Sequence, residues 1–581
     1  MFFPAANATM NTASPAPLTA PLTAALTAAL TAALIAAPTA APTAALTADF
    51  PADFPAQFRD LSTLIAGHAA ERPDATAVIE GGQRLSYSEL NQMVDRVAAA
   101  LQRDGQPPQR CIAICGASSL VYMALFIGAL RAGLAAAPLA PGSTPAQLTA
   151  MVADSGAALI FIDGAVAAMG VDWPAGSTVL RMDATEEAPT VEAWLTAAGT
   201  RPQPVAIDPA WPFNLIYSSG TTGTPKGIVQ PHAMRWAHIQ RAALSGYGPD
   251  AVTLIATPLY SNTTLVAVIP TLALGGCVVL MPKFEAGAYL QLAQQHRATH
   301  TMLVPVQYQR LMARPDFGDF DLRSFRHKFS TSAPFHAELK ADVLARWPGA
   351  LTEYYGMTEG GGTVALQAHL YPDKLHTVGQ PSEGHDIRLI DEAGRELPQQ
   401  PGVASPVSGE VVGRSPGMMS GYHGRPDLTA AAEWNDREGR RYIRTGDIGR
   451  FDADGFLILQ DRRKDMVISG GFNVYPSDLE AVLRAHPAVA DVAVVGVPSV
   501  QWGETPVAFV VRRAGHLEDA ETLRAWANAQ LGKTQRLSAL KLVTDLPRSA
   551  IGKVLKRELR DDWTRTERER RPDDQHAEGT P

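Results

Sequence analysis

The fold is decided by one short stretch, Tyr217-Ser218-Ser219-Gly220-Thr221-Thr222-Gly223-Thr224-Pro225-Lys226-Gly227. It contains five serine or threonine hydroxyls, three glycines and one lysine. Glycine allows backbone N–H groups to approach an anion closely and adopts positive φ. The hydroxyls add donors on rotatable arms, and the Lys226 ammonium adds a compact positive charge. This composition predicts a loop that binds the phosphates of a nucleoside triphosphate.

Two other interpretations of this stretch are weaker. An ordinary polar turn seldom follows an apolar run such as 213–217 with so many hydroxyls and glycines. The P-loop of nucleotide hydrolases requires Gly, four residues, Gly, Lys and then Ser or Thr. Counted from Gly220, Pro225 stands where the second glycine belongs, and Gly227 stands where the magnesium-binding hydroxyl belongs. We therefore reject the P-loop.

Four further motifs follow in order along the chain. They are Tyr355-Gly356-Met357-Thr358-Glu359, Arg444-Thr445-Gly446-Asp447, Asp461-Arg462-Arg463-Lys464-Asp465 and Pro547-Arg548-Ser549-Ala550-Ile551-Gly552-Lys553. With the phosphate loop, their order and spacing resemble the adenylate-forming superfamily, which includes acyl-CoA synthetases, luciferases and the adenylation domains of peptide synthetases. The chain is most similar to the acyl- or aryl-CoA ligases of that superfamily. The resemblance covers about residues 55–562.

The apolar segments favour an α/β fold. Short runs rich in valine and isoleucine alternate with longer stretches of helical spacing, which is typical of helices layered on largely parallel strands. A chain of 581 residues is too long for one compact core. The resemblance implies a large N-terminal AMP-binding domain of layered sheets and helices over 51–461 and a small α+β C-terminal domain over 462–562. We expect tails at 1–50 and 563–581.

Several local elements carry clear signals. Ser86-Tyr87-Ser88-Glu89 has the form of a capping box, and one apolar helix face follows it, formed by Leu90, Val94, Ala98 and Leu101. Buried strands are predicted at 252–256, 277–280 and 300–304. Another strand is predicted to end at Leu459, before a charged run that suits a hinge. The resemblance places that hinge at Lys464.

The resemblance assigns an ATP site to named residues. The phosphates would be bound by Ser218, Ser219, Gly220, Thr221, Thr222, Gly223 and Lys226. Thr358 would reach the α-phosphate, and Glu359 would bind Mg²⁺ as a hard oxygen ligand. Tyr355 would stack on adenine, while Asp447 and Arg462 would bind the ribose hydroxyls. Alternatively, Asp447 caps a turn and Arg462 forms a surface ion pair.

Lys553 is predicted to be catalytic, together with Thr358 and Glu359. Gly552 allows a mobile loop, and the Lys553 ammonium would bridge the reacting carboxylate and the α-phosphate as charge develops. This role depends on the resemblance, because a lysine considered alone is more often a surface residue. Lys556, in the same basic run, is expected to be such a surface residue.

The resemblance also implies a second step, in which the small domain turns about Lys464 and presents another face for attack by a thiol. The pantetheine arm of coenzyme A would then pass along Ser469, Gly470 and Gly471. A tight hairpin is the alternative for these three residues. One stretch departs from the family, because Thr534 and Gln535 replace the Tyr-Lys pair of many members. Altered domain docking and an altered grip on the coenzyme A phosphates, with Lys533 and Arg536 as substitutes, are both open.

The residues around the expected substrate favour a monocarboxylic acid. The stretch 257–262 has no acidic residue for the ammonium group of an amino acid. The stretch 353–355 offers aromatic surface where a dicarboxylate would need an arginine. A pocket for an aromatic ring or a medium or long aliphatic chain is predicted from Tyr260, Asn262, Val306, Ser332, Gly360, Gly361 and Gly362.

Composition excludes several classes of partner. The net charge is −8 and the basic residues are scattered, so no field attracts nucleic acid or an anionic membrane. The three cysteines, Cys111, Cys115 and Cys277, have no CxxC spacing. This argues against a disulfide framework or zinc site and favours a reducing cytoplasm.

The first 48 residues are of low complexity, with four-residue repeats over 17–48 that prolines interrupt. No apolar stretch reaches the roughly 20 residues of a membrane span. No lysine or arginine precedes Arg59, so the charged start of a secretory signal is missing. We expect a disordered tail, or a true translation start at Met10 or later.

Together these observations predict an ATP-dependent acid–thiol ligase. It would form an acyl-adenylate and transfer the acyl group to coenzyme A, with AMP and pyrophosphate as products. Only a charged tail follows Leu559, without a carrier domain, which favours free coenzyme A as the acceptor. An enzyme that loads a separate carrier protein and a non-catalytic nucleotide-binding homologue are the alternatives. The identity of the acid and the oligomeric state are left open.

Overall fold

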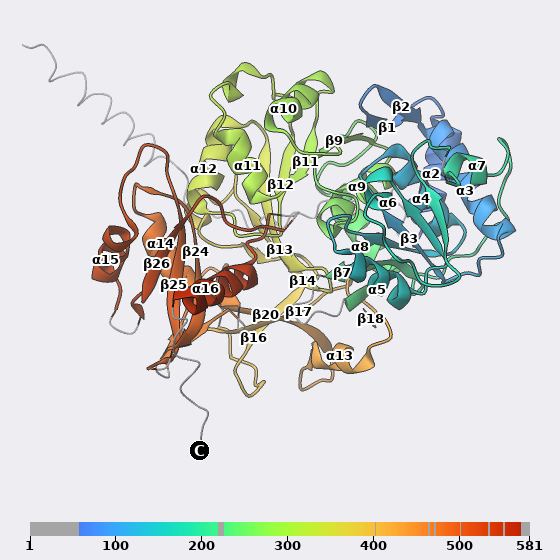
Figure 1. Ribbon diagram of the computed structural model, residues 1–581. Helices are drawn as coiled ribbons and strands as arrows, with labels where there is room; N and C mark the ends of the chain where they lie inside the picture. Colours follow the sequence, from blue (N-terminus) through green and yellow to red (C-terminus); the bar gives the residue numbers. More distant parts are fainter. Residues whose placement is uncertain are drawn as a thin grey trace, which may run out of the picture. The chain divides into compact units, whose positions relative to one another are not determined.

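Figure 1 shows the computed structural model of the protein, which describes residues 57–570 except Glu187, 219–225, Pro401, 463–464, 470–471, Val500, 533–534 and 550–551. Four β-sheets organise these residues. The predicted N-terminal tail lies outside the described residues.

The two largest sheets are mostly parallel. One is nine-stranded, in the order β15 (Gln380–Pro381), β14 (Gly360–Gln367), β13 (Ala350–Met357), β12 (His327–Ser330), β11 (His300–Leu303), β9 (Val252–Ile255), β10 (Cys277–Leu280), β1 (Thr76–Glu80) and β2 (Gln83–Ser86). The other is seven-stranded, in the order β18 (Gly421–Tyr422), β8 (Lys226–Pro231), β7 (Pro212–Ser218), β4 (Ala135–Leu139), β3 (Cys111–Cys115), β5 (Leu159–Ile162) and β6 (Thr178–Arg181). Several of their central strands are buried along their whole length, for example β3 and β4 in the seven-stranded sheet and β11 in the nine-stranded sheet, as parallel strands covered on both faces require.

Two five-stranded sheets complete the fold. The first has the order β16 (Asp386–Ile390), β17 (Gly409–Arg414), β20 (Arg441–Phe451) and β19 (Glu433–Asn435), with β21 (Leu457–Arg462) paired to β20. The second has the order β23 (Phe472–Val474), β22 (Val467–Ser469), β25 (Gly503–Arg512) and β24 (Val489–Ser499), with β26 (Ala539–Val543) paired to β25.

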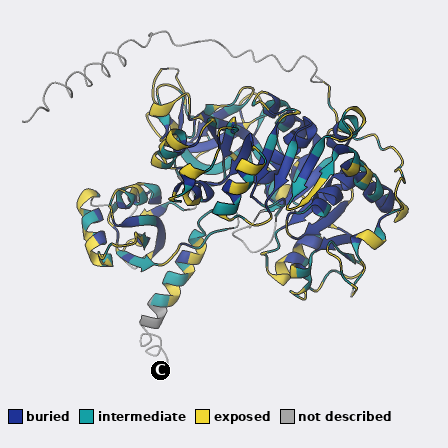
Figure 2. Cartoon of the chain, turned by 90° about the horizontal axis from the view of Figure 1, so that it is seen from above, coloured by how far each residue is buried: buried dark blue, intermediate teal, exposed yellow. Residues whose placement is uncertain are grey.

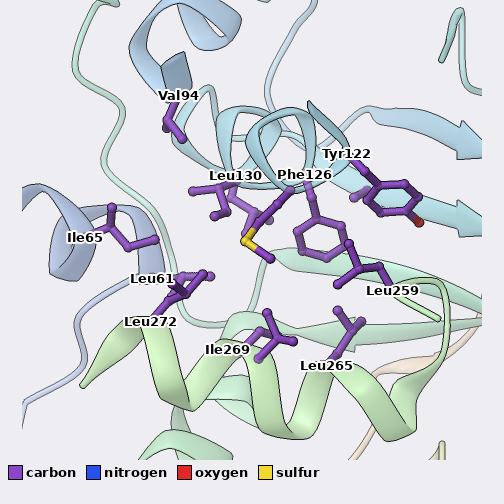
Figure 3. Packing of buried hydrophobic residues seen from close by; sticks show 14 of the residues in the cluster. Leu61, Ile65, Val94, Tyr122, Phe126, Leu130, Leu259, Leu265, Ile269 and Leu272 are labelled. Atoms are coloured by element: carbon purple, nitrogen blue, oxygen red, sulfur yellow. The ribbon is translucent and has the colours of Figure 1, made fainter. Parts of the chain in front are cut away.

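Helices cover the two large sheets in layers. One continuous core cluster joins strands of both sheets to residues of α2 (Leu61–Glu71), α3 (Tyr87–Arg103), α4 (Leu120–Arg131), α8 (His232–Ala243) and α9 (Asn262–Ala273). Figure 3 shows α4 and α9 facing each other within this cluster, with Phe126 and Leu130 above Leu265 and Ile269. A second cluster joins the nine-stranded sheet to α10 (Ala286–Gln295), α11 (Pro305–Met312) and α12 (Ala337–Arg346). A third joins the seven-stranded sheet to α5 (Pro145–Ser155) and α6 (Gly164–Ala167).

The C-terminal sheet has its own core. It packs against α14 (Pro476–Arg484) and α15 (Ala520–Gln530) in one cluster and against α16 (Lys556–Arg570) in another. Figure 2 shows the buried residues concentrated in the strands and in the helix faces that cover them. The remaining short helices are α7 (Val191–Trp194) and α13 (Pro426–Ala431). No described helix combines the length and the apolar character that crossing a bilayer requires.

These observations confirm the α/β fold class with a large N-terminal and a small C-terminal part. The capping box is also confirmed, because Ser86 Oγ accepts from the Glu89 N–H at 3.2 Å while Glu89 Oε2 accepts from the Ser86 N–H at 2.7 Å. The apolar residues that follow it on α3 are fully buried. The three predicted strands correspond to β9, β10 and β11, each within one residue of the expected bounds.

One predicted strand end was wrong. The strand expected to end at Leu459 is β21, which continues to Arg462 because its backbone stays paired with β20 as far as Asp447. Helix α16 runs to Arg570, into the expected tail. It is held by Trp563, whose ring contacts Phe509 edge-on, and by Lys541, whose ammonium donates to Asp562 at 2.7 Å. The domain boundary near residue 461 stays a prediction.

Strand β14 passes unusually close to β17, where a glycine is required. A Cβ atom added to Gly413 would lie 1.7 Å from the carbonyl oxygen of Gly361. We expect Gly413→Ala to destabilise the protein by about 3 kcal/mol, because two backbones must separate. Gly318→Ala is the matched control, since no atom lies within 4 Å of its added Cβ. Urea unfolding of both variants checks this expectation, and equal midpoints would contradict it.

Candidate active site

The Thr358-Glu359 pair forms the turn of the hairpin between β13 and β14. Met357 pairs with Gly360, so these two residues alone connect the strands. The glycines that follow have positive φ, 86° at Gly360 and 70° at Gly361. A Cβ atom at Gly360 would lie 2.1 Å from the carbonyl oxygen of Gly417, so the turn packs directly against another backbone segment. The Met419 N–H donates to the Glu359 carbonyl at 2.8 Å, which fixes the turn from the same side.

Tyr422 contacts both Lys226, which is predicted to bind phosphate, and Glu359, which is predicted to bind the metal ion. It lies on β18, which pairs with β8, the strand that begins at Lys226. The Lys226 Nζ lies 5.6 Å from the centre of the Tyr422 ring, and the Tyr422 hydroxyl donates to Glu359 Oε1 at 2.8 Å. Burial and the nearby Glu359 charge raise the pKa of Tyr422, so the hydroxyl remains a donor. A cation and a carboxylate are therefore brought to one tyrosine.

The predicted adenine and ribose residues are also joined. The Tyr355 hydroxyl donates to Asp447 Oδ2 at 2.8 Å. Asp447 lies within β20, opposite Arg462 on β21, and its own N–H donates to Thr445 Oγ1 at 3.0 Å. Adjacent strands thus carry the two residues predicted for the ribose. Their roles in binding the nucleoside stay predictions.

The loop that carries Lys553 is held by hydrogen bonds. Arg548 Nη1 donates to the Gly552 carbonyl at 2.7 Å, and the Ser549 N–H donates to the Lys553 carbonyl at 2.8 Å. Gly552 has φ of 75°, and a Cβ atom there would lie 2.8 Å from Val306 Cγ1. The loop therefore lies against a residue of the predicted acyl pocket. Lys556 pairs instead with Glu480 at 2.9 Å.

The other predicted pocket residues have polar contacts. Ser332, at φ of 81°, shares a 2.6 Å hydrogen bond with Thr263. Asn262 Oδ1 accepts from Gln230 Nε2 at 3.3 Å. Tyr260 is partly buried, and that burial raises the pKa of its hydroxyl. The predicted apolar pocket therefore has a polar side as well.

Several predicted site residues lie outside the described residues. They are Ser219, Gly220, Thr221, Thr222 and Gly223 of the phosphate loop, Lys464 of the hinge, Gly470 and Gly471 of the coenzyme A passage, and Lys533 and Thr534. The flanking strands are described. Ser218 pairs with Lys226 across β7 and β8, and Ser469 pairs with Phe472 across β22 and β23.

Sequence reasoning missed two arginines on α8. Arg241 places its guanidinium 5.2 Å from the centre of the Tyr354 ring and donates to Thr363 Oγ1 at 3.2 Å. Arg235 is only 1% exposed. The prediction against a dicarboxylic acid was based on the residues next to Tyr355 in the sequence. These two arginines lie on α8, which is distant from Tyr355 in the sequence. A charged residue inside an otherwise buried helix face was the available signal.

The chain belongs to the AMP-binding enzyme family. The model of that family matches residues 65–423, and the model of the AMP-binding enzyme C-terminal domain matches residues 478–553. Both matches confirm the resemblance inferred from the motifs.

The relatives and the solved structure that the chain matches are named for transfer of the acyl group to different acceptors. The chain is 35% identical to a feruloyl-CoA synthase of Amycolatopsis sp over 493 residues, covering 84% of this chain and 96% of the relative. It is 31% identical to a fatty acid–[acyl-carrier-protein] ligase of Streptomyces coeruleorubidus, covering 85% and 94%. The structure of an amide bond synthetase from Marinactinospora thermotolerans matches with a TM-score of 0.77 and 30% identity, covering 87% of this chain and 99% of that chain.

Proposed function

We propose that this protein is an ATP-dependent acid–thiol ligase that converts a monocarboxylic acid to its coenzyme A thioester. The proposal is carried by the contact of Lys226 and Glu359 with one tyrosine. A triphosphate bound to the adjoining loop would have a cation beside its outer phosphates and a carboxylate available for a metal ion. The Tyr355 and Asp447 pair, on β13 and β20, suits the nucleoside of the same molecule.

In the first step a carboxylate oxygen attacks the α-phosphorus of ATP, the bond to the bridging oxygen breaks, and pyrophosphate leaves. In the second step the thiol sulfur of coenzyme A attacks the acyl carbonyl, the bond between the acyl carbon and the phosphate oxygen breaks, AMP leaves and the thiol proton is released. The protein's contribution is position and charge, because negative charge accumulates on the α-phosphate. Lys553 would neutralise that charge in the first step, and Thr358 would orient the phosphate.

Mg²⁺ fits this site as an ion held mainly by the nucleotide. Among the described residues no group of three or more histidine, cysteine or acidic side chains gathers as a metal site. Glu359 supplies one carboxylate, and its Oε2 is not used by Tyr422. One carboxylate plus substrate phosphates is the usual coordination of Mg²⁺ in nucleotide enzymes. The ion would supply charge neutralisation at the phosphates.

The acid is proposed to be aromatic or a medium or long aliphatic chain. The relative named feruloyl-CoA synthase supports an aromatic acid and coenzyme A as the acceptor. The carrier-protein ligase and the amide bond synthetase support keeping a carrier protein and an amine as rival acceptors. The two arginines on α8 are a reason to include dicarboxylic acids in any test.

The decisive measurement is pyrophosphate release from ATP and Mg²⁺ across a panel of aromatic, aliphatic and dicarboxylic acids, each with and without coenzyme A. We expect one class of monocarboxylic acid to give sustained release that requires coenzyme A, with a thioester product detectable by mass. Release without coenzyme A dependence would instead favour a carrier protein or amine as acceptor. Silence with every acid would contradict the proposal and favour a non-catalytic nucleotide-binding protein.

A further inference from the structure

A buried polar network contacts the Thr358-Glu359 turn. Gln230, at the end of β8, is fully buried, and its Nε2 donates to the Thr358 carbonyl at 2.6 Å and to Asn262 Oδ1 at 3.3 Å. Its Oε1 accepts from Asn214 Nδ2 at 2.9 Å and from Arg235. Four partners therefore saturate the amide. It joins the turn predicted to contact the α-phosphate to a residue of the predicted acyl pocket.

The orientation of the Gln230 amide is set by Arg235 at one end and by the Thr358 carbonyl at the other. A guanidinium can only donate, so the atom of Gln230 that faces it must be the oxygen. That choice points the NH₂ group toward the Thr358 carbonyl and Asn262. Turned by 180°, the amide would place its NH₂ group against two donors and its oxygen against two acceptors. Arg235 and the Thr358 carbonyl therefore determine together which way the amide faces.

Arg235 has no carboxylate partner within the described part of the chain. Its Nε and Nη2 donate to Asn214 Oδ1 at 3.2 and 2.9 Å, and Nη1 lies 3.5 Å from His238 Nδ1. Burial lowers the pKa of Arg235 to about 9, so it is still charged at pH 7. A buried cation without a carboxylate partner is costly to maintain, and its hydrogen bonds to Asn214 and Gln230 and the Phe213 ring, 5.7 Å from the guanidinium carbon, offset part of that cost. Its presence beneath a site for anions is consistent with a role in function.

We propose that Arg235 is a positioning residue which, through the amide of Gln230, holds the Thr358-Glu359 turn and Asn262 in the geometry that the adenylation step needs. This positioning role depends on the proposed function only for its expected effects on the reaction rate. Alignment of the carboxylate with the α-phosphate requires both elements to be fixed, and a displacement of about 1 Å can reduce a rate about 10²-fold.

Gln230→Glu is the sharpest test, because it changes one NH₂ group to an oxygen. The carboxylate still accepts from Asn214 and Arg235, and it gives Arg235 a counter-charge, so we expect the melting temperature to stay within about 3 °C. The donors to the Thr358 carbonyl and to Asn262 Oδ1 are both lost, and the new carboxylate oxygen then faces these two oxygens. We expect kcat for pyrophosphate release to fall about 10- to 100-fold, with KM for ATP changed less than about threefold.

Arg235→Met tests the other end of the network, since Gln230 then has no charged donor to fix its orientation. The matched control is Asn528→Asp on α15. Asn528 likewise bridges a backbone carbonyl and N–H, those of Leu537, at 3.0 and 2.8 Å. We expect this control to lose the same kind of donor without any change in kcat.

Hydrogen–deuterium exchange supplies a readout that does not depend on turnover. The peptide 355–362 should exchange faster in Gln230→Glu and in Arg235→Met than in the wild type or in Asn528→Asp. Unchanged exchange in the first two variants would overturn the inference, whatever their activity. If the wild type shows no turnover with any acid but the two variants still exchange faster than the wild type, the positioning role is supported and the proposed function is contradicted.

Discussion

Replacing Lys553 with alanine is expected to reduce pyrophosphate release by about 10²- to 10³-fold, the typical effect of removing one donor that stabilises developing negative charge. The hydrogen bonds from Arg548 to the Gly552 carbonyl and from the Ser549 N–H to the Lys553 carbonyl do not use the Lys553 side chain, so the substitution leaves them in place. Single-turnover measurement with ATP and the best acid checks this expectation. KM for ATP should change little, since the ammonium acts mainly as charge develops.

Two controls define the role of Lys553. Lys556→Ala removes a lysine from the same run whose ammonium pairs with Glu480, and we expect its effect on the rate to be under about twofold. A preformed acyl-adenylate offered with coenzyme A should react with the Lys553→Ala protein at a nearly normal rate, because no pyrophosphate leaves in that step. Equal loss in both half-reactions would contradict a role confined to adenylation.

Glu359→Gln is expected to lower kcat by about 10²-fold and to raise the concentration of Mg²⁺ needed for half-maximal activity. Glutamine can still accept from the Tyr422 hydroxyl, so the turn keeps this contact while it loses the anionic oxygen that suits a hard cation. The measurement is a Mg²⁺ titration of pyrophosphate release at fixed ATP. An unchanged Mg²⁺ requirement would mean that the ion is bound elsewhere.

Tyr422→Phe tests whether the Tyr422 hydroxyl helps Glu359 to bind the metal ion. The ring that lies beside Lys226 is kept, while the donor to Glu359 is lost. Groups that orient a metal ligand typically contribute 10- to 100-fold to metal affinity. We therefore expect a shift in the Mg²⁺ titration toward the lower end of that range, clearly smaller than the effect of Glu359→Gln. A larger effect than that of Glu359→Gln would assign Tyr422 a direct role at the phosphates.

The sequence predicted the elements whose signals are local. The capping box at Ser86 and the strands β9, β10 and β11 depend on spacing within a few residues, and all are confirmed. The family was recognisable because its motifs are contiguous. Tyr422 carried no such signal, since its contacts with Lys226 and Glu359 depend on a two-residue strand pairing with β8.

The network around Arg235 could not be predicted for a related reason. Asn214 lies on β7, Gln230 on β8 and Thr358 in the turn between β13 and β14, and only strand pairing and the packing of α8 bring them together. The end of β21 was misplaced because the charged residues before Arg463 look like a loop, while strand pairing to β20 extends through Arg462. Hydrogen bonding between strands distant in sequence overrode local composition in each case.

The candidate site draws Lys226 and Tyr422 from the seven-stranded sheet, Glu359 and Tyr355 from the nine-stranded sheet, and Asp447 from a five-stranded sheet. A nucleotide held by all of them would act as a non-covalent cross-link between residues of three different sheets. Ligand present at 100 times its Kd adds about 2.7 kcal/mol to the stability of the state that binds it. The bound nucleotide would then contribute to the stability of the protein. The affinity for the nucleotide would in turn depend on how the three sheets are positioned relative to one another.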